Sequence, residues 1–126
     1  MRRLALDADG IAAWFDPDPD RRELRAEYEA GTLTVVGPSR LPGDVLARIA
    51  ERWHPDPARL ARIGTELDRL RFELHEPSTG ELAPWIARGL STGQAAVAAV
   101  AASLDVRLVT KDGDLVRTAS HLVASG

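Results

Sequence analysis

Residues 90–114 read LSTGQAAVAAVAASLDVRLVTKDGD, and they predict a buried helix, a buried strand and an acidic loop in direct succession. Small apolar residues surround the whole of the helix expected over 91–104, which is typical of a helix covered on all sides. The apolar and β-branched residues of 106–110 favour a strand, and Asp112 and Asp114 follow its carboxyl end. A helix that leads straight into a buried strand indicates an α/β fold with a mostly parallel sheet.

The N-terminal residues show the same order of strand and acidic turn. Leu4 to Leu6 form a short apolar run that predicts a buried strand, and residues 7–10, DADG, predict a turn. Ligands of parallel α/β sheets bind beyond the carboxyl ends of the strands. If the two strands are neighbours, four carboxylates therefore meet in one crevice: Asp7, Asp9, Asp112 and Asp114.

The remaining segments alternate between helix and strand, and the length of 126 residues predicts one domain over 1–126. Further strands are expected at 32–36 and 71–75, with an edge strand at 121–124. An N-terminal cap at Asp20 predicts a helix over 21–30. The other helices are expected at 11–15, 41–53, 60–70, 82–88 and 115–119.

The composition narrows the classes of function. The net charge is −3, with 44% hydrophobic and 28% charged residues, close to globular averages. A protein that binds nucleic acid through a basic surface alone would be positively charged, so any such role needs a local arginine patch or a metal-neutralised acidic site. The chain has no cysteine, which excludes disulfides and thiolate chemistry. The N-terminus does not resemble a signal peptide and no apolar run is long enough to span a membrane, so we expect a cytoplasmic protein.

The carboxylates expected at this edge of the sheet need neutralisation, because crowded carboxylates without basic partners raise each other's pKa. A divalent cation removes this conflict, and Mg²⁺ and Mn²⁺ prefer oxygen ligands. Such ions can activate water and stabilise the leaving oxygen in phosphodiester hydrolysis. Acidic residues are also common in α/β turns as helix caps and turn formers. Both interpretations of the acidic pairs are open at this point.

Three segments resemble the motifs of PIN domains, in the order in which that family has them. They are LALDADGIAAWF at 4–15, GPSRLPGDVLARIA at 37–50 and LSTGQAAVAAVAASLDVRLVTKDGDL at 90–115. The resemblance implies a three-layer α/β/α sandwich with a mostly parallel central sheet, and Mg²⁺- or Mn²⁺-dependent cleavage of RNA. Small PIN proteins are typically the toxin half of bacterial type II toxin–antitoxin pairs. The resemblance therefore also implies an RNA substrate, a protein antitoxin and a homodimer.

The resemblance assigns metal-binding and catalytic roles to three residues of this chain. Asp7 matches the family's first metal-binding aspartate, Asp44 its helical glutamate, and Asp112 its last metal-site acid. Asp44 also has a purely structural explanation, since an acidic residue in the first turn of a helix is favoured by the helix dipole. Supporting roles fall to Asp9, Gln94, Thr110 and Asp114.

Gln94 departs from the family pattern, which usually has an aspartate at this position. A glutamine offers one neutral oxygen and no charge, so two cations brought together there should bind less tightly, unless Asp9 supplies the missing charge. The departure predicts a weaker ribonuclease, a single metal ion, or a PIN domain that only binds a partner.

A haloacid-dehalogenase-like phosphatase is the rival enzyme. Asp7 and Asp9 resemble that family's Asp-x-Asp-Gly opening, in which the first aspartate is the nucleophile and the second the acid/base. Lys111 and Asp114 faintly resemble its later motifs. Two observations argue against this interpretation. The chain is short for that family, and no helix and strand separate Lys111 from Gly113 and Asp114.

The resemblance to a toxin also predicts a partner surface. A groove between helices should accept an amphipathic segment of an antitoxin, in the mode of a helix bound in a groove. The candidates for the wall of this groove are Trp14, Trp53 and Trp85.

Overall fold

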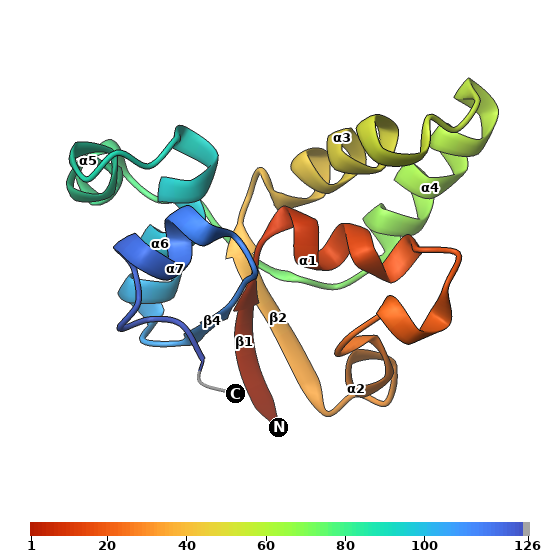
Figure 1. The fold of residues 1–126 in the computed structure, drawn as a ribbon. Coiled ribbons are helices and arrows are strands. Elements are labelled where there is room, and N and C mark those ends of the chain that lie inside the picture. Colours follow the sequence, from red (N-terminus) through yellow and green to blue (C-terminus); the bar gives the residue numbers. More distant parts are fainter. Residues whose placement is uncertain (125–126) are drawn as a thin grey trace.

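A four-stranded parallel sheet forms the centre of the computed structural model, which describes residues 1–124 (Figure 1). The strands are β1 (Arg2–Leu6), β2 (Leu33–Pro38), β3 (Glu73–His75) and β4 (Arg107–Val109), and their order is β3-β2-β1-β4. All three neighbouring pairs are parallel. The mostly parallel sheet expected from the sequence is therefore confirmed.

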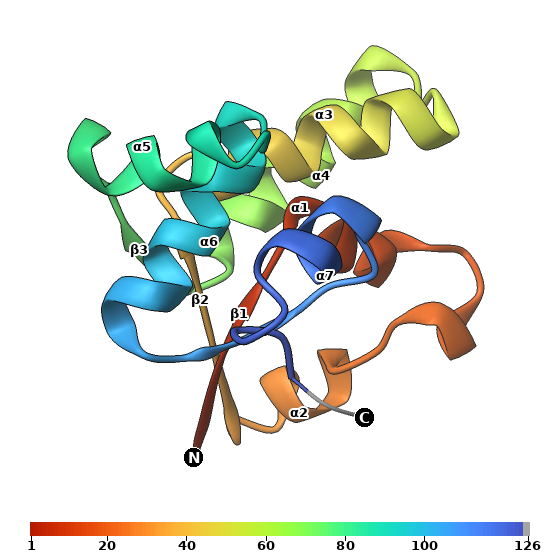
Figure 2. The ribbon, with the colours of Figure 1, turned by 60° about the vertical axis from the view of Figure 1, so that its left-hand side comes forward.

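Helices cover both faces of the sheet, which makes the fold a three-layer α/β/α sandwich. In Figure 1 one layer lies to the right of the sheet and the other to its left, and Figure 2 shows them from another side. The right-hand layer contains α1 (Ala8–Ala12), α2 (Arg25–Glu29), α3 (Leu41–Trp53) and α4 (Pro57–Arg69). The left-hand layer contains α5 (Thr79–Ala87), α6 (Thr92–Leu104) and α7 (Gly113–Thr118).

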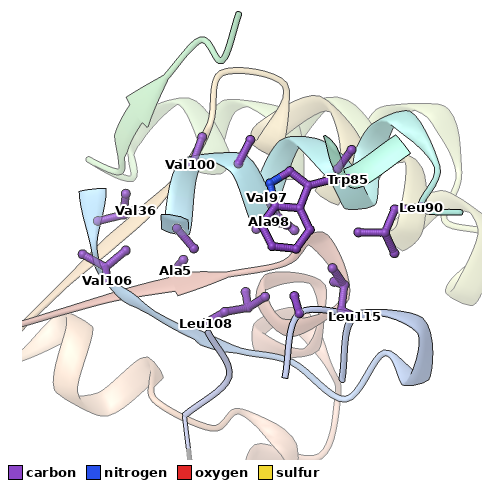
Figure 3. Close-up of a cluster of buried hydrophobic side chains, with 14 residues drawn as sticks. Ala5, Val36, Trp85, Leu90, Val97, Ala98, Val100, Val106, Leu108 and Leu115 are labelled. Atoms are coloured by element: carbon purple, nitrogen blue, oxygen red, sulfur yellow. The ribbon is translucent and has the colours of Figure 1, made fainter. Parts of the chain in front are cut away.

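The side chains of β1 alternate between two cores, because successive residues of a strand point to opposite faces of a sheet. Leu4 and Leu6 join the core beneath α1, α3 and α4, whereas Ala5 joins the core beneath α6 (Figure 3). All seven residues of 95–101 in α6 are buried. The buried helix expected from its small residues is thus confirmed.

The order of the strands places a crevice beside β1. The chain passes from β1 to β2 and β3 on one side and returns to β4 on the other side. In open α/β sheets, ligands bind where the strand order reverses in this way, outside the carboxyl ends of the strands. The segments after β1 and β4 meet at this point.

Four helices begin earlier than their apolar periodicity predicts. Each is preceded by a residue whose side chain accepts a hydrogen bond from a backbone N–H of the first turn, so the helix starts directly after its cap. Because the first of these caps is Asp7, residues 7–10 form the beginning of α1 rather than the expected turn. The caps of α1, α4, α5 and α7 are Asp7, Asp56, Ser78 and Asp112.

The helix expected over 21–30 is wrong in its first half. Only Arg25–Glu29 is α-helical, and Leu24 before it has a φ of 67°, which interrupts a helix. The backbone there is held by a tertiary contact: the indole N–H of Trp14 donates to the carbonyl of Glu23 at 2.7 Å. A long-range hydrogen bond of this kind leaves no trace in local periodicity.

The expected cap at Asp20 is also wrong. A 3₁₀ turn spans Pro19–Arg21, and its cap is Asp18, whose side chain accepts from the N–H of Asp20 at 3.0 Å. Proline at the first position of such a turn, with its fixed φ, favours this start two residues earlier than expected.

The edge strand expected over 121–124 is reduced to one bridge. Val123 pairs in parallel with Leu108 of β4, and the N–H of Ala124 donates to the carbonyl of Leu108 at 2.8 Å. Within residues 1–124, none of the helices combines the length and the apolar character that crossing a bilayer requires.

Candidate functional site

A cleft with a volume of about 440 Å³ lies where β1 and β4 end. Its walls come from the start of α1, from α3 and from the N-terminus of α6, together with the loop before α7. Five of the residues predicted for the site line this cleft: Asp7, Asp9, Asp44, Gln94 and Asp112. Its other charged residues are Arg40, Arg48 and Glu51.

Asp7 is the buried carboxylate of the cleft, with 9% of its surface exposed. Its Oδ1 accepts a hydrogen bond from the N–H of Gly10 at 2.8 Å, and its Oδ2 accepts one from the hydroxyl of Thr110. Burial raises the pKa of Asp7, and the charges of Asp9 and Asp112 add to that rise, while the two hydrogen bonds oppose it. In the described part of the chain, no basic side chain forms an ion pair with Asp7.

The hydroxyl of Thr110 connects the two strand ends. It donates to Oδ2 of Asp7 and accepts from the backbone N–H of Asp112 at 3.0 Å. A single hydroxyl group therefore links the Asp7 carboxylate to the backbone of Asp112. The two aspartates follow adjacent parallel strands, as their positions after buried strands predict.

Asp112 caps α7 and is held by several donors. Its Oδ1 accepts from the N–H groups of Asp114 and Leu115, at 2.8 and 3.2 Å. Its Oδ2 lies 3.1 Å from Nε2 of Gln94. Burial raises the pKa of Asp112, but these hydrogen bonds and the charge of Arg48 outweigh it, so the pKa lies below its ordinary value. Asp112 is therefore ionised at neutral pH.

Gln94 presents its amino group, not its oxygen, to the carboxylates. Oε1 accepts from the N–H of Ser91 at 2.9 Å, as part of the capping box of α6. Nε2 donates to Asp112 and, at 3.1 Å, to Asp114. Because a backbone N–H can only donate and an ionised carboxylate can only accept, both ends of the amide fix the same orientation. The expectation that Gln94 offers an oxygen to a cation differs from this arrangement.

The other three predicted carboxylates face arginines, and the first of them, Asp114, is outside the lining of the cleft and lies 2.5 Å from Nη2 of Arg117. Asp44, in the first turn of α3, lies 2.7 Å from Nε of Arg40. Asp9, in the first turn of α1, lies 3.3 Å from Nε of Arg48. Of the four predicted carboxylates that line the cleft, Asp7 and Asp112 are thus held by hydrogen-bond donors, whereas Asp9 and Asp44 form ion pairs.

Glu51 of α3 is a charged residue of the cleft that the sequence analysis did not predict. Glu51 lines the cleft and lies 3.3 Å from Nη1 of Arg48. The signal was available in the spacing, because positions 44, 48 and 51 are four and three residues apart and so share one face of a helix. Arg40 precedes them by one further turn.

The residues present fit a hard divalent cation in part. The donor set at Asp7, Thr110 and Asp112 consists of oxygen atoms, which such cations prefer. Among residues 1–124 no three Asp, Glu, His or Cys side chains are already gathered to hold a metal ion, and Asp44 is turned towards Arg40. Mg²⁺ is commonly held by one or two carboxylates, with water and substrate phosphate as its other ligands, and Asp7 and Asp112 are two cleft carboxylates without an ion pair in the described residues.

Two of the three tryptophans expose almost no surface to a partner. Trp14 is 1% exposed and packs against Tyr28 with ring centroids 5.2 Å apart, and Trp85 is 6% exposed in the core beneath α6. Trp53 is half-buried at the end of α3, with the guanidinium of Arg52 4.9 Å from its ring centroid. The prediction is therefore wrong for Trp14 and Trp85, because both rings complete the cores.

Comparison with known proteins supports the fold. The crystal structure of PAE2754 from Pyrobaculum aerophilum superposes with a TM-score of 0.59 and 22% sequence identity, covering 93% of this chain and 86% of that one. At this level of identity the similarity shows a shared fold and nothing further. No protein-family model matches the chain, and no curated protein matches its sequence.

Proposed function

We propose that the protein is a metal-dependent ribonuclease that hydrolyses phosphodiester bonds at the cleft beside β1. The observation that carries this proposal is Asp7, a buried carboxylate next to a second carboxylate and without a basic partner in the described residues. Keeping such a charge buried is unfavourable unless it is paired or coordinates a metal. Its position at the reversal of strand order is where α/β proteins bind their ligands.

The roles of the side chains follow from their contacts. Asp7 and Asp112 would hold Mg²⁺ or Mn²⁺, which supplies an activated water and stabilises charge on the phosphate oxygens. Thr110 fixes the Asp7 carboxylate by donating to Oδ2. Asp44 lies across the cleft on α3, where it would orient the attacking water or complete the ligand set after leaving Arg40.

The space around Asp7 suits a polymer better than a phosphomonoester. A second hollow, of about 500 Å³, shares Asp7, Asp9 and Asp112 with the cleft. A chain that passes over Asp7 therefore has room on both sides. The rival phosphatase needs a lysine at the nucleophile, but Lys111 pairs with Glu23 and its side chain is 87% exposed.

The experiment is cleavage of a fluorescent single-stranded RNA by the purified protein. We expect cleavage in Mg²⁺ or Mn²⁺, none in EDTA, and none by Asp7→Asn. Asp68→Asn is the matched control, because Asp68 is exposed on α4 and outside the cleft. Equal cleavage by Asp7→Asn and Asp68→Asn would exclude the proposed site.

One observation favours a second candidate, a PIN-like module that binds a partner without catalysis. The amino group of Gln94 donates to both Asp112 and Asp114, and Asp114 also pairs with Arg117, so both carboxylates have partners without a cation. Mn²⁺ titration separates the candidates: the ribonuclease requires saturable Mn²⁺ binding that Asp7→Asn abolishes, whereas the module requires none.

The biological setting that we propose is a cytoplasmic toxin, held inactive by a protein antitoxin and active as a homodimer. It rests on the resemblance of the motifs to PIN toxins. Induced expression in bacteria should arrest growth, and Asp7→Asn should relieve the arrest while Asp68→Asn does not. Continued growth with the wild-type protein at verified expression levels would contradict the toxin role.

A further inference from the structure

The charge of the cleft opposes the binding of RNA. Five carboxylates and two guanidinium groups line it, which gives a formal charge of −3. The carboxylates are Asp7, Asp9, Asp44, Glu51 and Asp112, and the guanidinium groups belong to Arg40 and Arg48. These two arginines are the basic groups of the cleft that could bind a phosphate, and both already form ion pairs with carboxylates.

Arg40 is held over the cleft by Asp44 and lies beside the start of α6. Its Nε lies 2.7 Å from Oδ2 of Asp44. A Cβ added at Gly93 would lie 3.7 Å from both Cζ and Nη2 of Arg40 and 3.9 Å from Asp44. Arg40 and Asp44 therefore lie beside Gly93, at van der Waals distance from the start of α6. The Arg40 side chain is nevertheless 45% exposed, so phosphate can reach it.

Arg48 is held in the same way, two helical turns further along α3. Its Nε lies 3.3 Å from Asp9 of α1, its Nη1 lies 3.3 Å from Glu51, and its side chain is 54% exposed. Exposed ion pairs of this kind contribute little net stability. Arg40 and Arg48 can therefore leave their carboxylates for another anion at a small cost in free energy.

We propose that Arg40 and Arg48 are the phosphate ligands of the RNA and that they change partners when a divalent cation binds. The inference rests on the proposed function. A cation in the cleft draws Asp44 and Asp9 towards itself and releases the two arginines. The planar guanidinium groups then bind phosphate oxygens in pairs. Metal and RNA therefore bind cooperatively, and in the absence of RNA the arginines compete with the metal for the carboxylates.

The test compares Arg40→Ala/Arg48→Ala with Arg59→Ala/Arg62→Ala. The control pair carries the same change of charge, and neither Arg59 nor Arg62 lines the cleft or forms an ion pair within residues 1–124. Binding of a fluorescein-labelled single-stranded RNA is followed by anisotropy, in EDTA and in the first minute after addition of Mn²⁺. Free Mn²⁺ is measured by electron paramagnetic resonance without RNA, and melting curves verify that each variant is folded.

The arginines should have opposite effects on the two ligands. The wild-type protein and the control should bind RNA about tenfold more tightly in Mn²⁺ than in EDTA. The cleft variant should lose about tenfold or more of the RNA affinity in Mn²⁺ and bind Mn²⁺ severalfold more tightly than the wild type. Its plot of log affinity against log salt should be shallower by about 1.4, since each phosphate contact on a single strand contributes about 0.7.

Three results would overturn the inference: no RNA binding by the wild type in Mn²⁺, RNA affinity of the cleft variant within twofold of the control, or Mn²⁺ affinity that the arginine substitutions leave unchanged or lower. The cleavage assay with Asp7→Asn tests the proposed function separately. Cleavage that depends on Asp7 but not on the arginines would refute this inference alone. Absence of cleavage by the wild type would refute the proposed function instead.

Discussion

The surroundings of Asp7 and of Gln94 differ in how the repulsion between neighbouring carboxylates is reduced. Asp7 stays buried beside Asp9 and Asp112 with two hydrogen bonds and no ion pair in the described residues. Gln94 places a neutral donor against Asp112 and Asp114, which lowers the repulsion without adding charge. A bound cation would stabilise the Asp7 carboxylate, whereas the hydrogen bonds of Gln94 form without a cation. Substitutions at Asp7 and at Gln94 therefore test the two arrangements separately.

Asp7→Asn should stabilise the protein at neutral pH in EDTA. The pKa of Asp7 is raised in the folded state, so this residue favours folding most below its ordinary value of 3.8, and that contribution is lost as pH rises through the higher folded pKa. Removing the buried charge should raise the free energy of unfolding at pH 7 by about 1 kcal/mol, or the Tm by about 3–5 °C. The difference should vanish near pH 3. A variant that melts below the wild type at pH 7 would contradict the assignment.

Gln94→Glu tests the amino group while keeping the capping box, because glutamate is favoured at this position of the box. A carboxylate oxygen then replaces Nε2 at about 3.1 Å from Asp112 and Asp114. We expect a loss of about 2 kcal/mol in the free energy of unfolding in EDTA and tighter binding of Mn²⁺. Glu81→Gln is the control, since it changes the same position of the Ser78 capping box on α5, outside the cleft. Mn²⁺ affinity equal for Gln94→Glu and the wild type would place Gln94 outside the metal site.

At the scale of elements, four helices begin at the cleft, α1, α3, α6 and α7, and three of them have a side-chain cap. The N-terminal caps of α1, α6 and α7 are Asp7, Ser91 and Asp112. A capping side chain is held by backbone N–H groups, so two of the proposed metal ligands are positioned by the helices that they start. The structural and the functional explanation of these aspartates are therefore compatible, and they can be distinguished by substitution.

Asp112→Ser and Asp112→Ala separate capping from metal binding. Serine is as good a cap as aspartate, whereas alanine costs about 1 kcal/mol. Both variants should lose Mn²⁺-dependent cleavage, but only the alanine variant should lose stability in EDTA. Asp56→Ala removes the cap of α4, away from the cleft, and should lose stability while keeping cleavage. Full cleavage by Asp112→Ser would show that Asp112 acts only as a helix cap and is not needed to bind the metal.

Periodicity predicted the elements whose residues are buried, and it failed where tertiary contacts decide the structure. The small residues of 95–101 and the apolar run at 4–6 predicted α6 and β1, because burial on a regular element leaves a regular pattern. The interruption at Leu24 depends on Trp14, ten residues earlier in the chain. Such a contact is not encoded in any local pattern.

In the candidate site too, features that follow from local sequence could be predicted, whereas features set by tertiary contacts could not. Asp7 and Asp112 could be predicted because each follows a buried strand, and the strands are neighbours. The orientation of the Gln94 amide could not, since it depends on Ser91 on one side and on a different loop on the other. The ion pair between Arg40 and Asp44 could have been predicted, because residues four positions apart on a helix are neighbours.

At the scale of the whole molecule, the order β3-β2-β1-β4 brings the ends of β1 and β4 together. The net charge of the chain is −3, and the residues that line the cleft also carry a formal charge of −3. A protein of this charge has no general attraction for RNA. The affinity therefore has to come from the cleft itself, from a cation that neutralises its carboxylates and from Arg40 and Arg48, which that cation releases.

A crystal structure determined from crystals soaked in Mn²⁺, with data collected at the manganese absorption edge, tests this claim most directly. We expect an anomalous peak between Asp7 and Asp112, about 2.0–2.6 Å from an oxygen of each. Occupied sites should also show Asp44 turned away from Arg40. A map without a peak at these aspartates at saturating Mn²⁺, with Asp44 still on Arg40, would contradict it.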